Sequence, residues 1–152
     1  MISSTLLNSP SCLFYQTDHP RPVLDRAEGI YMWAMDGRRY VDASSGAMVC
    51  NIGHSNPHVL DAMRRQMEKS TFGYRLHFET EPSERLAAMT CALAWPGMDR
   101  AFFVSGGSEA VESAMKLSRQ YALAIGQGSR WKVISRWPSY HGCTLGALSV
   151  TG

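Results

Sequence analysis

A glycine turn followed by a serine is the segment of this chain best suited to chemistry. In the run SGGSEA, Gly106 and Gly107 follow an apolar run over residues 101–104. A stretch with helical periodicity begins near Ser108. Amide groups at a helix start have no intrahelical acceptor and lie at the positive end of the helix dipole, so they suit an anion such as a phosphate. The turn has neither P-loop nor GxGxxG spacing, and a packing role for the glycines remains open beside phosphate binding.

Ser108 also indicates a second chemistry, that of a serine hydrolase. Residues 106–110 read GGSEA, close to the GxSxG elbow of α/β hydrolases but with alanine in the last place. A triad in that fold needs an acid and then a histidine later in the chain. His141 is present, but no Asp follows Asp99 and no Glu follows Glu112. A hydrolase is therefore the second hypothesis, and a non-catalytic phosphate-binding or dimerising module is the third.

Tyr140 and His141 form a further candidate. They follow a second apolar run, residues 131–135, and so come after the carboxyl end of a predicted strand. Open α/β sheets bind their ligands at that edge. A planar ring that stacks on Tyr140 while its phosphate lies in the glycine turn would use both strand ends.

The elements that would position these residues alternate between strand and helix. The apolar run at 101–104 predicts a strand buried on both faces, and the periodicity after it predicts a helix from about Ser108 to Gly126. Residues 131–135 predict another strand. A strand, a helix and a strand of this length make a βαβ unit, so we expect a parallel sheet covered by helices and an α/β fold class.

Turn chemistry predicts a hairpin nearer the amino end. Asp36 followed by Gly37 between two half-apolar runs favours a hairpin over residues 30–42, because both residues accept the positive φ of a tight turn. The small residues and two glycines of SSGAMVCNIGHSNP, residues 44–57, indicate a loop.

Two helices are predicted between the hairpin and the glycine turn. Asn56 followed by Pro57 is a helix start, and apolar spacing continues it to Lys69. A second helix is predicted from Pro82 to about Ala94.

Composition excludes several classes of protein. The chain has 152 residues, of which 45% are hydrophobic and 18% charged, with a formal net charge of +2. These values indicate a soluble globular chain with no nucleic acid partner. No apolar run is long enough for a membrane partner, so the cytoplasm is the expected compartment. The cysteines have neither disulfide-framework nor metal-site spacing, and we expect reduced core thiols and no metal. They are Cys12, Cys50, Cys91 and Cys143.

Four segments, in family order, resemble the class III (omega-type) aminotransferases, fold type I enzymes that use pyridoxal 5′-phosphate (PLP). They are GIYMWAMDGRRYVDASSG, NIGHSNPHVLDAMRRQ, FFVSGGSEAVESAMKLSRQY and SYHGCTLGALSVTG, within residues 29–152. The resemblance implies the amino-terminal third of such an enzyme, an incomplete domain with a mostly parallel sheet and flanking helices. Residues 1–56, with the hairpin, would belong to the small domain. Residues 57–152 would be the first part of the large PLP-binding domain, truncated.

The resemblance also implies site residues. Gly107 and Ser108 correspond to the family's phosphate cup, and Gly106 precedes them in the same turn. Tyr140 lies against the pyridine ring in the family, and His141 shapes the same wall. These five are the expected cofactor-binding residues. Met48 and Tyr140 are the expected substrate-binding residues. Residues 72–78 resemble a stretch that reaches across the interface of a homodimer.

The implied reaction moves an amino group between an amine or amino acid and an oxo acid. In the family a lysine forms the Schiff base with the cofactor and an aspartate pairs with its pyridine nitrogen, and both come after the matched segments. None of Lys69, Lys116 and Lys132 matches the lysine motif, so no catalytic residue is assigned. We therefore expect this chain by itself to be inactive.

Overall fold

The computed structural model describes residues 11–15 and 21–152, so residues 1–10 and 16–20 of the amino-terminal segment lie outside the described residues. The chain divides into two compact units, the first ending at Gly73 and the second beginning at Tyr74. The division after residue 56 that the resemblance implies stays a prediction.

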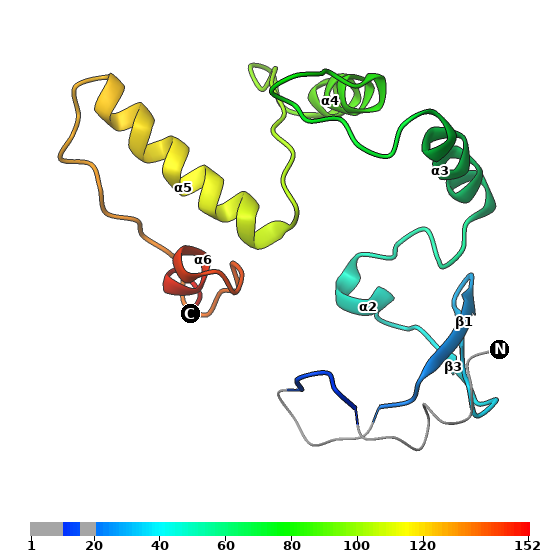
Figure 1. Cartoon of the computed structure of the whole chain (residues 1–152). Helices are drawn as coiled ribbons and strands as arrows, with labels where there is room; N and C mark the ends of the chain where they lie inside the picture. The colour runs from blue at the N-terminus through cyan, green and yellow to red at the C-terminus, as the bar shows by residue number, and fades with distance from the viewer. Residues whose placement is uncertain (1–10, 16–20) are drawn as a thin grey trace. The chain divides into compact units, whose positions relative to one another are not determined.

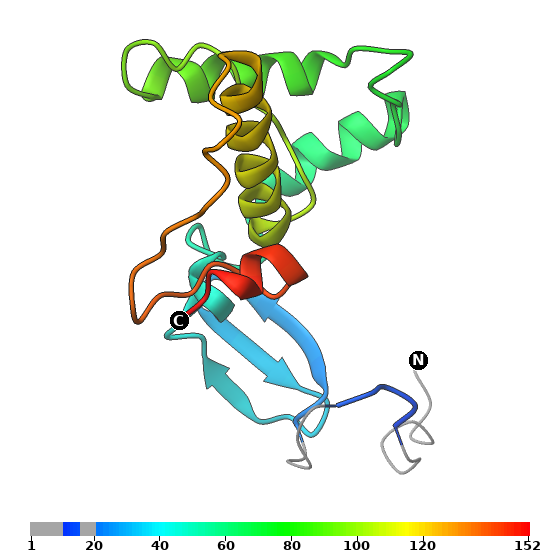
Figure 2. The ribbon, with the colours of Figure 1, turned by 90° about the vertical axis from the view of Figure 1, so that its left-hand side faces the viewer.

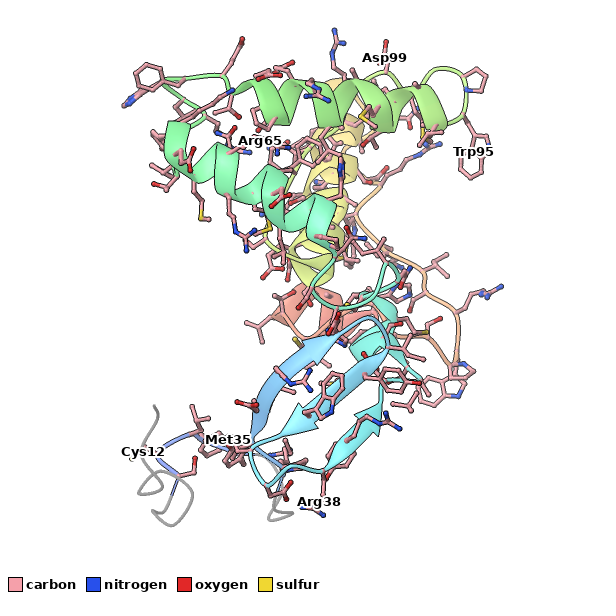
Figure 3. The ribbon with its side chains drawn as sticks, turned by 90° about the vertical axis from the view of Figure 1, so that its right-hand side faces the viewer. Cys12, Met35, Arg38, Arg65, Trp95 and Asp99 are labelled. Atoms are coloured by element: carbon pink, nitrogen blue, oxygen red, sulfur yellow. The ribbon has the colours of Figure 1, made fainter. Side chains whose placement is uncertain are left out.

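The first unit contains a three-stranded antiparallel sheet in the order β1-β2-β3 (Figure 2). The strands are β1 (Leu24–Glu28), β2 (Tyr31–Ala34) and β3 (Arg39–Val41). The predicted hairpin is confirmed as β2 and β3, and Gly37 has the positive φ of 85° that its turn requires. The Arg38 amide donates to Asp36 Oδ1 at 3.0 Å, which closes the turn. Figure 3 shows Met35 and Arg38 at this end of the sheet.

Strand β1 was absent from the sequence prediction. Its residues, LDRAE, have no apolar alternation and are mostly exposed. The strand is stabilised instead by its pairing with β2 and by Arg26, whose guanidinium lies 3.5 Å from the centre of the Trp33 ring.

A short irregular helix, α2 (Ser45–Met48), interrupts the predicted loop of residues 44–57. Its backbone has positive φ at Ser45, Gly46 and Met48. Helix α3 (Pro57–Lys69) has the predicted bounds. The Asn56 side chain accepts hydrogen bonds from the amides of the first turn of α3, at 3.1 and 3.3 Å.

The second unit consists of three helices joined by extended segments. Helix α4 (Glu81–Leu93) matches the predicted helix to within one residue at each end. In the turn that follows it, Trp95 projects into solvent (Figure 3). Helix α5 (Gly107–Ala124) begins at the glycine turn. The chain then runs back as an extended segment, and α6 (Leu145–Ser149) lies beside the first turns of α5 (Figure 1).

The two strands predicted around α5 are not formed, so those predictions were wrong. Residues 101–104 and 131–135 are extended but pair with no strand in the described part of the chain. Phe102 is 61% exposed and Ile134 is 95% exposed, which contradicts burial on both faces. A central strand needs a hydrogen-bonded neighbour on each side and a layer over each face, and residues 21–152 supply neither to these segments.

Little apolar surface is fully buried. Among the described residues the buried hydrophobic side chains are Ala34, Ala122 and Ala147. All four cysteines are free, as predicted, but their placement in a core was wrong, because Cys12 and Cys143 are exposed and the other two are half-buried. No described helix combines the length and the apolar character needed to cross a bilayer.

Candidate functional site

The amino end of α5 presents backbone amides beyond the glycine turn. Gly106 is the N-cap residue, and its carbonyl accepts the first bond of the helix from the Ala110 amide at 3.0 Å. No side chain caps this end in the described structure. The amides of Gly107 and Ser108 precede the first residue whose amide finds an acceptor in the helix. An added Cβ at Gly107 would meet nothing within 4 Å, so open space adjoins the turn.

The hydroxyl of Ser108 joins this turn to the segment that carries Tyr140 and His141. Ser108 Oγ accepts a hydrogen bond from the Cys143 amide at 3.0 Å, and the Cys143 Sγ lies 3.8 Å away. Because the hydroxyl accepts from the amide, its own hydrogen is left to donate to a further group.

Gly142 allows the two segments to approach closely. A Cβ at this position would contact Ser108 Oγ and would lie 2.8 Å from Ser108 Cα and 2.9 Å from Ala147 Cβ. Its φ of 134° is also one that residues with side chains rarely adopt. Glycine is therefore required here for two independent reasons.

Glu112 makes a second connection between α5 and α6. Its Oε1 accepts from the Gly146 amide at 2.7 Å. The Thr144 hydroxyl and then the amides of Gly146 and Ala147 lower the pKa of the Glu112 carboxyl. The Thr144 hydroxyl makes no hydrogen bond of good geometry, so we regard the Gly146 amide as the principal partner. Sequence reasoning missed this role, although Glu112 is the last acid in the chain.

The backbone of His141 is held by Thr151, whereas Tyr140 is left free. The His141 amide donates to Thr151 Oγ1 at 3.1 Å, and this hydroxyl lies 3.0 Å from the carbonyl oxygen of Ala147. Tyr140 is 78% exposed, and its ring contacts no other ring in the described part of the chain. The second unit thus brings Gly107 and Ser108 together with the segment of Tyr140 and His141.

The other predicted residues lie elsewhere. Met48 belongs to the first unit, where it is exposed at the end of α2. In the stretch 72–78, the Arg75 guanidinium lies 4.6 Å from the centre of the Phe102 ring, and Leu76 and Phe78 are exposed.

Two alternative chemistries receive no geometric support. The hydrogen-bond partner of Ser108 Oγ is Cys143, and no histidine bonds to it within the described residues. No group of three or more His, Cys, Asp or Glu side chains arranged for a metal ion occurs in the part of the chain that the structure describes.

Comparison with known proteins establishes the family. The model of the family described as Aminotransferase class-III matches residues 14–152. The chain belongs to this family. The uncharacterized aminotransferase YodT of Bacillus subtilis (strain 168) is 46% identical over 132 residues, which cover 86% of this chain and 30% of YodT.

Solved transaminases confirm the resemblance to the fold type I enzymes. The thermostable (S)-enantioselective omega-transaminase of Thermomicrobium roseum matches with a TM-score of 0.86 and 37% identity, over 93% of this chain and 33% of that one. The taurine:2-oxoglutarate aminotransferase of Bifidobacterium kashiwanohense, in complex with PLP and glutamate, matches with a TM-score of 0.80 and 35% identity, over 91% and 30%. This class III chain spans about a third of the length of these relatives.

Proposed function

We propose that the chain is the cofactor-binding amino-terminal part of a PLP-dependent aminotransferase that moves an amino group between an amine or amino acid and an oxo acid. Membership of the class III family supports this proposal. The observation that carries it is the joint between Ser108 and Cys143, because it brings a helix start with uncapped amides to a segment that bears an exposed aromatic ring.

The residues present fit the phosphate and the ring of this cofactor. A phosphate ester at the start of α5 would accept from the amides of Gly107 and Ser108 and from the Ser108 hydroxyl, whose hydrogen is available. The acidic group of the first turn is Glu109, on the side of Gly106, where its Oε2 would lie 2.9 Å from an added Cβ. The anion therefore belongs on the Ser108 side of the turn.

Each residue of this site has a separate task. The amides and hydroxyl at Gly107 and Ser108 hold the phosphate, and the exposed phenol ring of Tyr140 stacks on the pyridine plane. His141, fixed through its backbone, forms the adjoining wall. When bound, the cofactor supplies an electron sink for charge that develops on the substrate carbon. Met48, exposed at the end of α2, is proposed to contact the amino donor.

The chain by itself is proposed to be inactive. Transamination needs an amine that moves a proton between substrate and cofactor carbons. Lys69, Lys116 and Lys132 do not match the family motif for that amine. Borohydride treatment with PLP is expected to leave no specific adduct at any of them.

Two further properties belong to this proposal. The whole protein is proposed to be a homodimer, and the exposed side chains of Leu76 and Phe78 in the predicted interface stretch support this. The cytoplasm is proposed as the compartment, and the four free thiols support it.

Binding of PLP and of pyridoxal, which lacks the phosphate, tests the phosphate cup. We expect PLP to bind the full chain at least about tenfold more tightly, measured by quenching of intrinsic fluorescence. Ser108→Ala removes a hydrogen bond to a charged group, which contributes about 1.5–3 kcal/mol, so the PLP affinity should fall by about 10- to 100-fold. Ser108→Thr should retain most of the affinity.

The matched control is Ser118→Ala. This hydroxyl also lies on α5, but it donates to the Ala114 carbonyl at 2.8 Å and not to a ligand. Its removal should leave PLP affinity unchanged. Equal affinities for PLP and pyridoxal, or equal effects of the two alanine variants, would refute the proposed cup.

A further inference from the structure

Three side chains of the first unit are linked by two successive contacts, and none of them is among the residues proposed to hold the cofactor. His54 Nε2 is 2.8 Å from Asp42 Oδ2, and His54 Nδ1 is 3.6 Å from the Sγ atom of Cys50. A thiol, an imidazole and a carboxylate in this order are the groups of a cysteine nucleophile with its base and orienting acid.

The sheet fixes the acid and the base. Asp42 follows β3, and its amide donates to the Ile30 carbonyl at 2.8 Å. The backbones of His54 and Gly29 exchange two hydrogen bonds, at 2.8 and 3.0 Å. Asp42 Oδ1 also accepts from the Gly46 amide at 3.2 Å. The distance between carboxylate and imidazole is therefore set by backbone pairing on both sides.

Turns on either side fix the thiol. The Cys50 amide donates to the Ser45 carbonyl at 3.1 Å, and the Cys50 carbonyl accepts from the Gly53 amide at 3.0 Å. Gly53 has a φ of 79°, and a Cβ there would lie 3.0 Å from the Gly29 carbonyl oxygen. This close approach keeps the turn that carries Cys50 against the backbone that carries His54.

The charge of the partly buried Asp42 carboxylate determines which ring nitrogen of His54 carries the hydrogen. The side chains of Asp42 and His54 are only 10% and 23% exposed. The hydrogen bond from His54, followed by the Gly46 amide, lowers the pKa of the Asp42 carboxyl, so that it is ionised at neutral pH. An ionised Asp42 can only accept, so in the neutral imidazole the His54 Nε2 atom carries the hydrogen and Nδ1 presents its lone pair to the thiol.

We propose that Cys50 is a site of oxidation by hydroperoxides, with His54 as the base and Asp42 as the group that orients it. The thiol proton moves to His54 Nδ1, and the sulfur attacks one oxygen of the peroxide. A sulfur–oxygen bond forms as the oxygen–oxygen bond breaks, and the leaving oxygen takes the proton from His54. Cys50 becomes a sulfenic acid, oxidised by two electrons, while the hydroperoxide is reduced to an alcohol, or hydrogen peroxide to water.

Exposure alone predicts a different order of reactivity among the thiols. Cys12 and Cys143 are exposed, whereas Cys50 and Cys91 are half-buried. Within the described residues, only Cys50 has a histidine ring nitrogen in contact with its sulfur. If accessibility decided the rate of oxidation, Cys12 and Cys143 would react first. If the contact with His54 decides it, Cys50 reacts first.

The test uses the reduced full chain, hydrogen peroxide and dimedone, which traps sulfenic acids, with each cysteine peptide followed by mass spectrometry. An unassisted thiol is only a few per cent ionised at pH 7, so full ionisation raises its rate by at most about 30-fold. We expect Cys50 to be labelled about tenfold faster than Cys12 and Cys143, within that ceiling. His54→Gln should bring the Cys50 rate down to that of Cys12, and Asp42→Asn should lower it in part.

The matched control is His58→Gln, because His58 is an exposed histidine near the cluster with no contact to a thiol. It should leave the Cys50 rate unchanged. A purely structural role for His54 predicts the opposite sign, since loosening the turn would expose Cys50 and speed its labelling. A faster or unchanged Cys50 rate in His54→Gln, or a wild-type Cys50 rate no higher than that of Cys12, overturns the proposal.

Discussion

Substitution of Gly142 by alanine tests the joint between α5 and α6 most directly. The new Cβ would lie 2.8 Å from Ser108 Cα and 2.9 Å from Ala147 Cβ, whereas carbon atoms at optimal separation are about 3.5–4.0 Å apart. The segment that carries Cys143 would therefore have to move away from Ser108 by roughly 0.7 Å.

The cost of the substitution can be compared with the energy of the hydrogen bond between Ser108 and Cys143. Overpacking of this kind costs about 1–3 kcal/mol, and holding alanine in a sparsely populated region of backbone conformation costs roughly 1–3 kcal/mol more. The hydrogen bond between Ser108 Oγ and the Cys143 amide contributes only about 0.5–1.5 kcal/mol. The penalty exceeds that contribution, so Gly142→Ala should break the hydrogen bond between Ser108 and Cys143, while Glu112 still holds the Gly146 amide.

Hydrogen exchange at individual amides measures the effect. We expect the Cys143 amide to lose its protection in Gly142→Ala. Gly126→Ala is the matched control, because Gly126 also has a positive φ, 74°, but an added Cβ there would meet nothing within 4 Å. That variant should carry a backbone penalty without the close contacts, and it should keep the Cys143 amide protected. Equal protection in the two variants would show that close approach at Gly142 does not hold the joint.

Two further predictions follow from charge and from exposed surface. The pKa of Glu112 is lowered, so its stabilisation of α6 is fully present above the ordinary pKa of a glutamate and is lost as pH falls through the lowered value. In NMR titrations the Gly146 amide shift should change at a pH below the ordinary pKa of a glutamate and should not change in Glu112→Gln, and a transition at the ordinary pKa would contradict this. The chain exposes 13672 Å², against about 9,300 Å² for two separate compact units of its mass, so we expect broad, weakly cooperative calorimetric unfolding. A sharp melt with a compact gel-filtration profile would count against that expectation.

Elements fixed by local chemistry were predictable from the sequence. The pair Asp36 and Gly37 determines the hairpin turn, and Asn56 before Pro57 determines where α3 begins. These signals act over a few residues, so no knowledge of the rest of the chain is needed. Strand β1 was missed because its pairing with β2, and not its own residues, makes it a strand.

The two predicted strands were wrong because pairing with a neighbour, and not apolar character alone, makes a segment a strand. Residues 101–104 and 131–135 have the apolar character of buried strands, but a strand forms only against a partner, and the described chain supplies none to them. Apolar character thus indicates that these segments can form buried strands, but it does not identify the strands with which they would pair.

Contacts of the site between distant residues could not be read from local patterns. The sequence placed Ser108 near the start of a helix, but its bond to Cys143 spans 35 positions. The cluster of Asp42, Cys50 and His54 was missed likewise. Its only sequence signal is a cysteine four residues before a histidine, a spacing that gains meaning once β3 places the carboxylate beside the ring.

Because of Gly142, two proposed properties of the site, its affinity for the phosphate and its selectivity for the ring, can be varied independently by mutagenesis. The close approach of Gly142 to Ser108, and not the side chains of Tyr140 and His141, sets the spacing between the proposed phosphate anchor and the adjoining wall. If the proposed function holds, libraries that randomise residues 140 and 141 should therefore alter selectivity for the ring while affinity for the phosphate stays constant. Randomisation of residue 142 should reduce both the affinity for the phosphate and the selectivity for the ring.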